Sequence, residues 1–226
     1  MKGQSEIIST VIILGAAVTI ALALVYFLGP MVAGSRAHHQ VVNYLAQLSA
    51  GLESSIIYST SSSSTTNTTQ LLLITISGTR LPDETALYIY VIGRDPDTDR
   101  VLDPSTTPYN YTVYSLGTLD YSLVLSSTDF NTVLNELSSR WNLLSRLTID
   151  SSDIYILEDD GNLYRLSELS TINTTSIYIL GLAPIGYTEL YALVLTGPSD
   201  VVYEAVISTI INGEFYPVAQ HIVASE

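Results

Sequence analysis

The chain of 226 residues is strongly acidic, because 22 Asp and Glu against eight Lys and Arg give it a net charge of −14 at pH 7. This charge leaves no basic face for the phosphates of a nucleic acid, so we expect no nucleic-acid partner. The sequence contains no cysteine, which excludes disulfide bonds, thiol catalysis and thiolate metal sites.

An uncharged apolar run dominates the N-terminus. Residues 7–28 follow the polar cap Met1–Glu6, and no Lys, Arg, Asp or Glu occurs between Glu6 and Arg36. The run exceeds the ~20 apolar residues with which a helix crosses a bilayer, and it is too long for the apolar region of a secretory signal peptide. Apolar residues then recur at helical spacing as far as Ile56, which predicts one helix from Ser5 to Tyr58.

Lys2-Gly3-Gln4-Ser5-Glu6 followed by this apolar run resembles the type IV pilin superfamily, in particular archaeal pilins and archaellins. The resemblance implies cleavage between Gly3 and Gln4 by a prepilin peptidase, residence in the membrane before assembly, and polymerisation by a pilus assembly machinery. N-terminal helices would pack in the core of a homopolymer, and Leu45 and Leu48 could instead pack on the chain's own domain. The residues expected to make assembly contacts are Glu6, Leu14, Leu22, Val25, Leu45 and Leu48.

A polar Ser/Thr-rich tract at residues 59–70 predicts a linker. Beyond it, β-branched and aromatic runs bounded by turn formers predict strands. These runs cover residues 71–77, 86–92, 111–114, 121–125, 154–157, 176–180, 190–195 and 201–211. We expect a fragment that begins near Gln70 to fold by itself.

One amphipathic helix interrupts the strand pattern, because apolar residues from Phe130 to Leu147 recur at steps of three and four. Ser127, Thr128 or Asp129 could cap its start. The predicted fold is α+β: a long hydrophobic N-terminal helix and a β-rich, sandwich-like domain with one amphipathic helix. The expected boundaries are a leader at 1–3, an assembly or transmembrane helix at 4–58, a linker at 59–70 and an outer domain at 71–226.

Three Asn-X-Thr sequons could carry glycans on an exported chain. The acceptor residues would be Asn67, Asn110 and Asn173. A second pattern, the alternating acids of residues 95–103, resembles the start of a calcium loop. Its candidate ligands are Asp95, Asp97, Asp99 and Asp103. Arg100 stands where an EF-hand needs Gly, so we expect a solvated turn there and no metal site.

No catalytic motif stands out, since HExxH, a nucleophile elbow and a phosphate-binding glycine loop are all missing from the sequence. We therefore expect neither an enzyme nor a cofactor. The predicted function is that of a structural subunit of an extracellular type IV pilus-like filament used for adhesion. Two alternatives stay open: a membrane-anchored extracellular ectodomain that binds or catalyses, and a motility archaellin.

Overall fold

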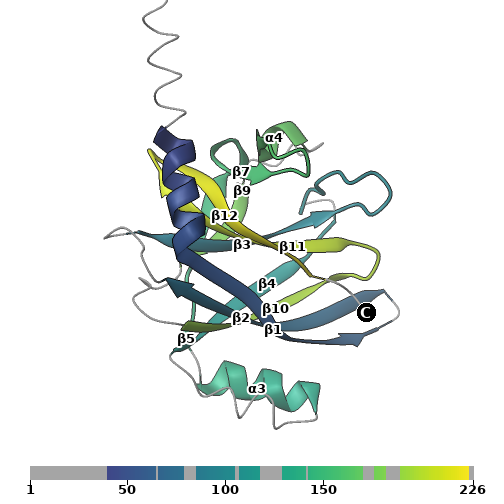
Figure 1. The fold of residues 1–226 in the computed structure, drawn as a ribbon. Coiled ribbons are helices and arrows are strands. Elements are labelled where there is room, and N and C mark those ends of the chain that lie inside the picture. Colours follow the sequence, from purple (N-terminus) through teal and green to yellow (C-terminus); the bar gives the residue numbers. More distant parts are fainter. Residues whose placement is uncertain are drawn as a thin grey trace, which may run out of the picture. The chain divides into compact units, whose positions relative to one another are not determined.

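The computed structural model describes residues 40–64, 66–78, 85–104, 107–117, 129–140, 142–169, 176–181 and 189–223. Of these residues, 59% lie in strands. The strands form two five-stranded sheets and one two-stranded sheet, and all neighbouring strands are antiparallel (Figure 1).

Sheet 1 has the order β1-β2-β10-β4-β5, and sheet 2 the order β12-β11-β3-β9-β6. The strands of sheet 1 are β1 (Leu52–Ser63), β2 (Asn67–Gly78), β10 (Glu189–Pro198), β4 (Asn110–Gly117) and β5 (Asn142–Leu143). Those of sheet 2 are β12 (Glu214–Val223), β11 (Val202–Ile211), β3 (Leu87–Arg94), β9 (Ser176–Gly181) and β6 (Arg146–Asp150). The small sheet pairs β7 (Tyr155–Leu157) with β8 (Leu163–Arg165), and the helical elements are residues 40–51, α3 (Phe130–Arg140), α4 (Leu166–Leu169) and the 3-10 turn η1 (Ser151–Asp153).

Strand β2 shows why the apolar runs of this sequence form sheets. Its residues Leu72, Ile74 and Ile76 belong to the large core that both sheets share. The alternate residues Leu71 and Leu73 belong to a second cluster, which contains residues of α3. Because both faces of the strand are covered, it is nearly continuous in apolar residues and does not alternate with polar ones.

The predicted amphipathic helix is α3, which covers the outer face of sheet 1 (Figure 1). Asp129 caps its start, where the side chain accepts hydrogen bonds from the Thr132 N–H at 3.0 Å and the Thr132 hydroxyl at 2.6 Å. The helix ends at Arg140, although apolar spacing continues to Leu147. Residues beyond it form β5 and β6, where Leu143 and Leu147 are exposed, so this spacing does not mark a buried helix face.

The predicted α+β class is wrong, because the described residues are mostly strand. The helix before the sheets covers residues 40–51 and does not reach Tyr58; β1 begins at Leu52. β-branched and aromatic residues such as Ile56, Ile57 and Tyr58 favour a strand that can pair along its length. None of the described helices is both long and apolar enough to cross a membrane. The part of the predicted helix before residue 40, and the predicted leader at residues 1–3, lie outside the described residues.

The Ser/Thr-rich tract is predicted to be a linker. It forms instead the C-terminal end of β1, the turn after it and the start of β2. The Ser64 N–H donates to the carbonyl oxygen of Asn67 at 2.8 Å in this turn. The compact unit that contains the sheets begins at Leu45, well before residue 71. A fragment that began near Gln70 would lack all of β1 and the core residue Leu52, which the compact unit includes.

Strand β1 contains a β-bulge at Ile57. Ile56 pairs with Ile74 and Tyr58 with Leu73, so Ile57 is one extra residue on β1. Ile56 packs against the core between the sheets, whereas Tyr58 packs against the cluster under α3. The bulge therefore exchanges the two faces of β1 halfway along the strand.

Candidate functional site

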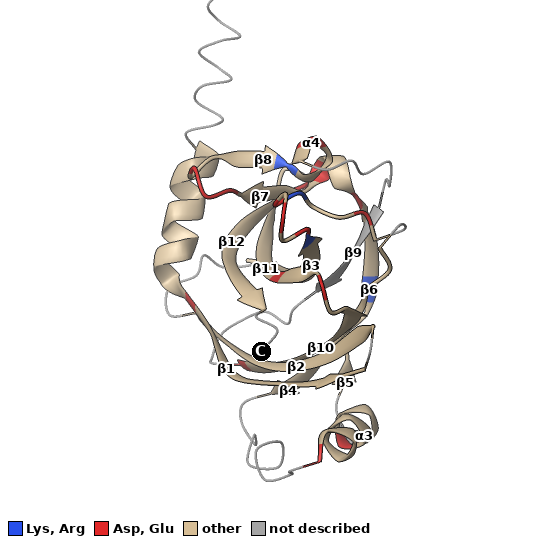
Figure 2. Ribbon diagram, turned by 90° about the vertical axis from the view of Figure 1, so that its right-hand side faces the viewer, with Lys and Arg blue, Asp and Glu red and all other residues tan. Residues whose placement is uncertain are grey.

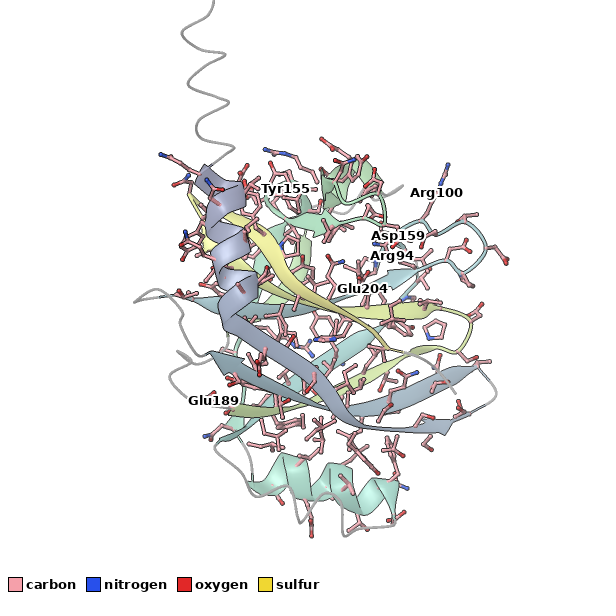
Figure 3. The ribbon with its side chains drawn as sticks, viewed as in Figure 1. Arg94, Arg100, Tyr155, Asp159, Glu189 and Glu204 are labelled. Carbon is pink, nitrogen blue, oxygen red and sulfur yellow. The ribbon has the colours of Figure 1, made fainter. Side chains whose placement is uncertain are left out.

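The most extensive ion-pair cluster among the described residues joins Arg94, Glu158 and Glu204. Figure 3 labels Arg94 and Glu204. Arg94 ends β3, Glu204 lies on the neighbouring strand β11, and Glu158 follows β7. The Arg94 guanidinium donates to both Glu158 oxygens, at 2.9 and 3.3 Å, and its Nε donates to Glu204 Oε2 at 3.1 Å. The three side chains are only 11%, 17% and 11% exposed. The cluster thus fixes the β7–β8 hairpin to sheet 2.

Gln220 of β12 extends this cluster. Its amide nitrogen donates to Glu204 Oε1 at 2.6 Å and to the Leu157 carbonyl at 3.1 Å, and its amide oxygen accepts from the Leu157 N–H. Burial lowers the pKa of Arg94, but hydrogen bonds and charges from Glu158 and Glu204 outweigh burial, so the net shift of that pKa is upward. Arg94 therefore stays protonated and serves as a fixed charge.

A cleft of about 120 Å³ lies over the cluster. Its lining comprises Arg94, Asp99, Leu157, Glu158, Asp159, Val202, Glu204 and Ile222. Four carboxylates surround one guanidinium, and Leu157 and Ile222 are 45% and 69% exposed. Because Arg94 engages both buried carboxylates, neither is free to act as a general base. The cleft can attract a cationic group, in keeping with the excess of Asp and Glu over Lys and Arg seen in Figure 2.

The alternating acids of residues 95–103 do not converge. Asp95 Oδ1 accepts hydrogen bonds from the N–H groups of Asp97 and Thr98, at 2.8 and 3.3 Å, and these bonds lower the pKa of Asp95. Asp99 lies 3.7 Å from Arg94, and Asp103 is buried. Within the described residues, no three His, Cys, Asp or Glu side chains are close enough to hold a metal ion. The acids form a turn beside a cleft of about 440 Å³ that Asp95, Asp97 and Asp200 help to line.

His221 joins the edge strands of the two sheets. Its Nε2 lies 2.8 Å from the Ser54 hydroxyl oxygen, which links β12 to β1. A Ser–His contact of this kind resembles part of a catalytic triad, but no carboxylate among the described residues is seen to orient the other ring nitrogen. Burial lowers the pKa of His221, so the neutral ring is favoured in the folded chain. The pair is a structural bridge between the sheets.

This bridge makes stability depend on pH. Because the folded chain holds His221 at a lowered pKa, the unfolded chain binds a proton more readily. The stability contribution is therefore complete above the unfolded His pKa of about 6.5 and is lost as the pH falls below it. We expect His221→Gln to reduce the loss of unfolding free energy between pH 7 and pH 5, measured by urea denaturation. An unchanged pH slope would contradict this assignment.

The structure places two of the three sequons. Asn67 is exposed at the start of β2, and Asn110 is exposed at the start of β4. Asn110 Oδ1 accepts a hydrogen bond from Arg146 at 2.7 Å. Asn173 lies outside the described residues.

Of the residues expected to make assembly contacts, only Leu45 and Leu48 lie among the described residues. Leu48 is fully buried and Leu45 is 9% exposed, and both belong to the compact unit that contains the sheets. Their side chains are thus used within the domain and are not displayed for a neighbouring subunit. The cleavage residues and the remaining assembly residues lie outside the described residues: Gly3, Gln4, Glu6, Leu14, Leu22 and Val25.

Sequence reasoning missed the Arg94 cluster, since its members are far apart in the chain. One signal was present: Glu204 is the lone charge inside the apolar run from Val201 to Ile211. A charge in such a run needs a partner when the strand is buried. No protein-family model matches the chain, and no curated protein matches it either.

Proposed function

We propose that this protein is a structural subunit of an extracellular type IV pilus-like filament, held in the membrane before assembly and polymerised through its apolar N-terminal segment. The observation that carries the proposal is the uncharged run of residues 7–28 directly behind Lys2-Gly3-Gln4-Ser5-Glu6. Such a run is stabilised by lipid or by close packing with copies of itself. Gly15, Ala16 and Ala17 would allow backbones to approach closely.

The β domain supports this division of roles. The described residues of its two core clusters come from both sheets and from α3. An uncharged apolar run as long as residues 7–28 is suited to contacts with lipid and then with other copies. The domain would form the outer part of the filament, where adhesion takes place.

A membrane-anchored binding ectodomain is the second candidate. The acidic cleft over Arg94, with exposed Leu157 and Ile222 at its lining, is the observation that favours it. Such a protein would use the apolar run only as an anchor and would remain dispersed.

Negative-stain microscopy of the native surface protein separates the two candidates. We expect filaments whose subunits begin at Gln4 by intact-mass analysis. Leu22→Asp should abolish them, because a charge in the middle of the run costs ~2.5 to 3.5 kcal/mol on insertion and would lack a partner in a packed core. Leu143→Asp, at a residue that is 57% exposed on the domain, is the matched control and should leave filaments intact.

Membrane fractionation shows whether Leu22→Asp still inserts. Loss of filaments from an inserted, folded variant supports polymerisation through the run. Dispersed particles from the native protein, or normal filaments from Leu22→Asp, would contradict the proposal.

A further inference from the structure

Two sequon asparagines share one face of sheet 1. Asn67 pairs with Pro198 of β10, and Asn110 pairs with Thr196 of the same strand. Opposed residues in a sheet share a face, and residues two apart on one strand do so as well. Asn67, Asn110 and Thr196 therefore all lie on the same side, together with Thr69, whose hydroxyl oxygen is 3.1 Å from that of Thr196.

The two asparagines are also near each other. Asn67 on β2 and Asn110 on β4 lie on opposite sides of β10, so they are two strand spacings apart. Their partners on β10, Pro198 and Thr196, are two residues apart along that strand. Strand spacings of ~4.8 Å and ~3.4 Å per residue place their Cα atoms about 12 Å apart. Because an N-linked glycan is bulky, two at this separation would cover this end of the face.

Local contacts leave both side chains accessible. Asn67 follows the tight turn in which the Ser64 hydroxyl donates to its carbonyl oxygen at 3.0 Å, and its side chain is exposed. At Asn110 the contact with Arg146 uses Oδ1. The Nδ2 atom, to which an N-linked glycan attaches, is not used in that contact.

The surroundings of the two sites are polar. Ser62 of β1 pairs with Thr69, and both Ser62 and Thr196 are exposed. Exposed apolar side chains occur on β7, β11 and β12, as Leu157, Ile210 and Ile222, and in sheet 1 on β1 and β5, as Ile57 and Leu143. Exposed apolar side chains are typical of contact surfaces, whereas a row of hydroxyl and amide groups is suited to water.

We infer that Asn67 and Asn110 both carry N-linked glycans, and that the part of the outer face of sheet 1 around them, beyond the area that α3 covers, points to solvent in the assembled filament. In the transfer, Asn Nδ2 bonds to the anomeric carbon of an oligosaccharide activated as a lipid-linked phosphate ester. The bond from that carbon to the phosphate oxygen breaks, the lipid phosphate leaves with the oxygen, and a base takes the amide proton. The inference rests on the proposed function, which supplies the export of the chain.

Glycopeptide mass spectrometry of native surface protein tests the first half. We expect both Asn67 and Asn110 to carry the glycan. Thr69→Ala and Thr112→Ala each destroy one sequon while keeping its asparagine, and each should lower the intact mass by one glycan. Thr69→Ser, the matched control, keeps the sequon and should keep the glycan. An unmodified Asn67 or Asn110 in native protein overturns the shared glycan face.

Maleimide labelling tests the second half, because the natural chain has no cysteine. Ser62→Cys should react at the same rate in assembled filaments as in detergent-dispersed chain. Protection of this cysteine only after assembly overturns the outward orientation. Filaments without glycans refute the inference and leave the proposed function standing, whereas glycans on a protein that never forms filaments refute the function and the orientation while leaving the two modification sites.

Discussion

Leu48→Asp is expected to unfold the β domain. Leu48 is fully buried in the helix that leads into β1. Removing a buried leucine side chain alone costs about 2–5 kcal/mol, and the new carboxylate would be buried without a partner. Together these losses are comparable with the whole stability of a domain, about 5–15 kcal/mol. Urea denaturation of the full chain in detergent, followed by circular dichroism, measures the effect.

Val42→Asp is the matched control, because Val42 lies on the same helix and is 42% exposed. Its effect should stay within about 0.5 kcal/mol, as for most surface substitutions. Equal unfolding of the two variants would show that helix composition, and not burial at Leu48, is responsible. The comparison also matters for assembly, since filament loss in a Leu48 variant would report an unfolded domain and not a broken subunit contact.

Arg94→Met should destabilise the domain by about 3–5 kcal/mol, the usual cost of breaking a buried ion pair by removing one partner. The substitution keeps an unbranched apolar side chain in place of the arginine stem but leaves the carboxylates of Glu158 and Glu204, which are 17% and 11% exposed, without their cation. Denaturant unfolding at pH 7 measures the loss.

Two comparisons separate charge from packing. Adding Glu158→Gln and Glu204→Gln to Arg94→Met should restore much of the lost stability, because no uncompensated charge then remains. Arg165→Met breaks the Arg165–Glu214 pair, whose side chains are 38% and 30% exposed, and should cost about 1 kcal/mol or less. A triple variant as unstable as Arg94→Met alone would assign the loss to packing.

The sequence predicts most strands of the β domain because their apolar runs are long and bounded by turn formers. It predicts the start of α3 equally well, since Asp129 caps the helix and Val133 and Leu137 are buried. The sequence-based prediction fails where the spacing of apolar residues favours one conformation and pairing with another strand favours a different one. Apolar spacing up to Ile56 suits a helix, but β2 offers a partner along the whole of β1, and pairing decides the conformation.

The candidate sites show the same limit. Sequons and alternating acids are local patterns, so the sequence reveals Asn67, Asn110 and Asp95 directly. The cluster of Arg94 with Glu158 and Glu204 depends on residues 64 and 110 positions apart, which only the fold brings together. No spacing rule could have paired them.

The β-bulge at Ile57 gives β1 one residue more than its pairing with β2 uses. Ser54 and Ile56 face one side of sheet 1, and Tyr58 faces the other, only because one additional residue stands between Ile56 and Tyr58. Because Ile57 has no partner of its own on β2, deleting it would leave Ile56 paired with Ile74 and Tyr58 with Leu73, so the later residues of β1 would keep their faces in a regular strand. Homologous chains should therefore tolerate the loss of this one residue, whereas a deletion within the paired part of β1 would shift the residues beyond it to the opposite face.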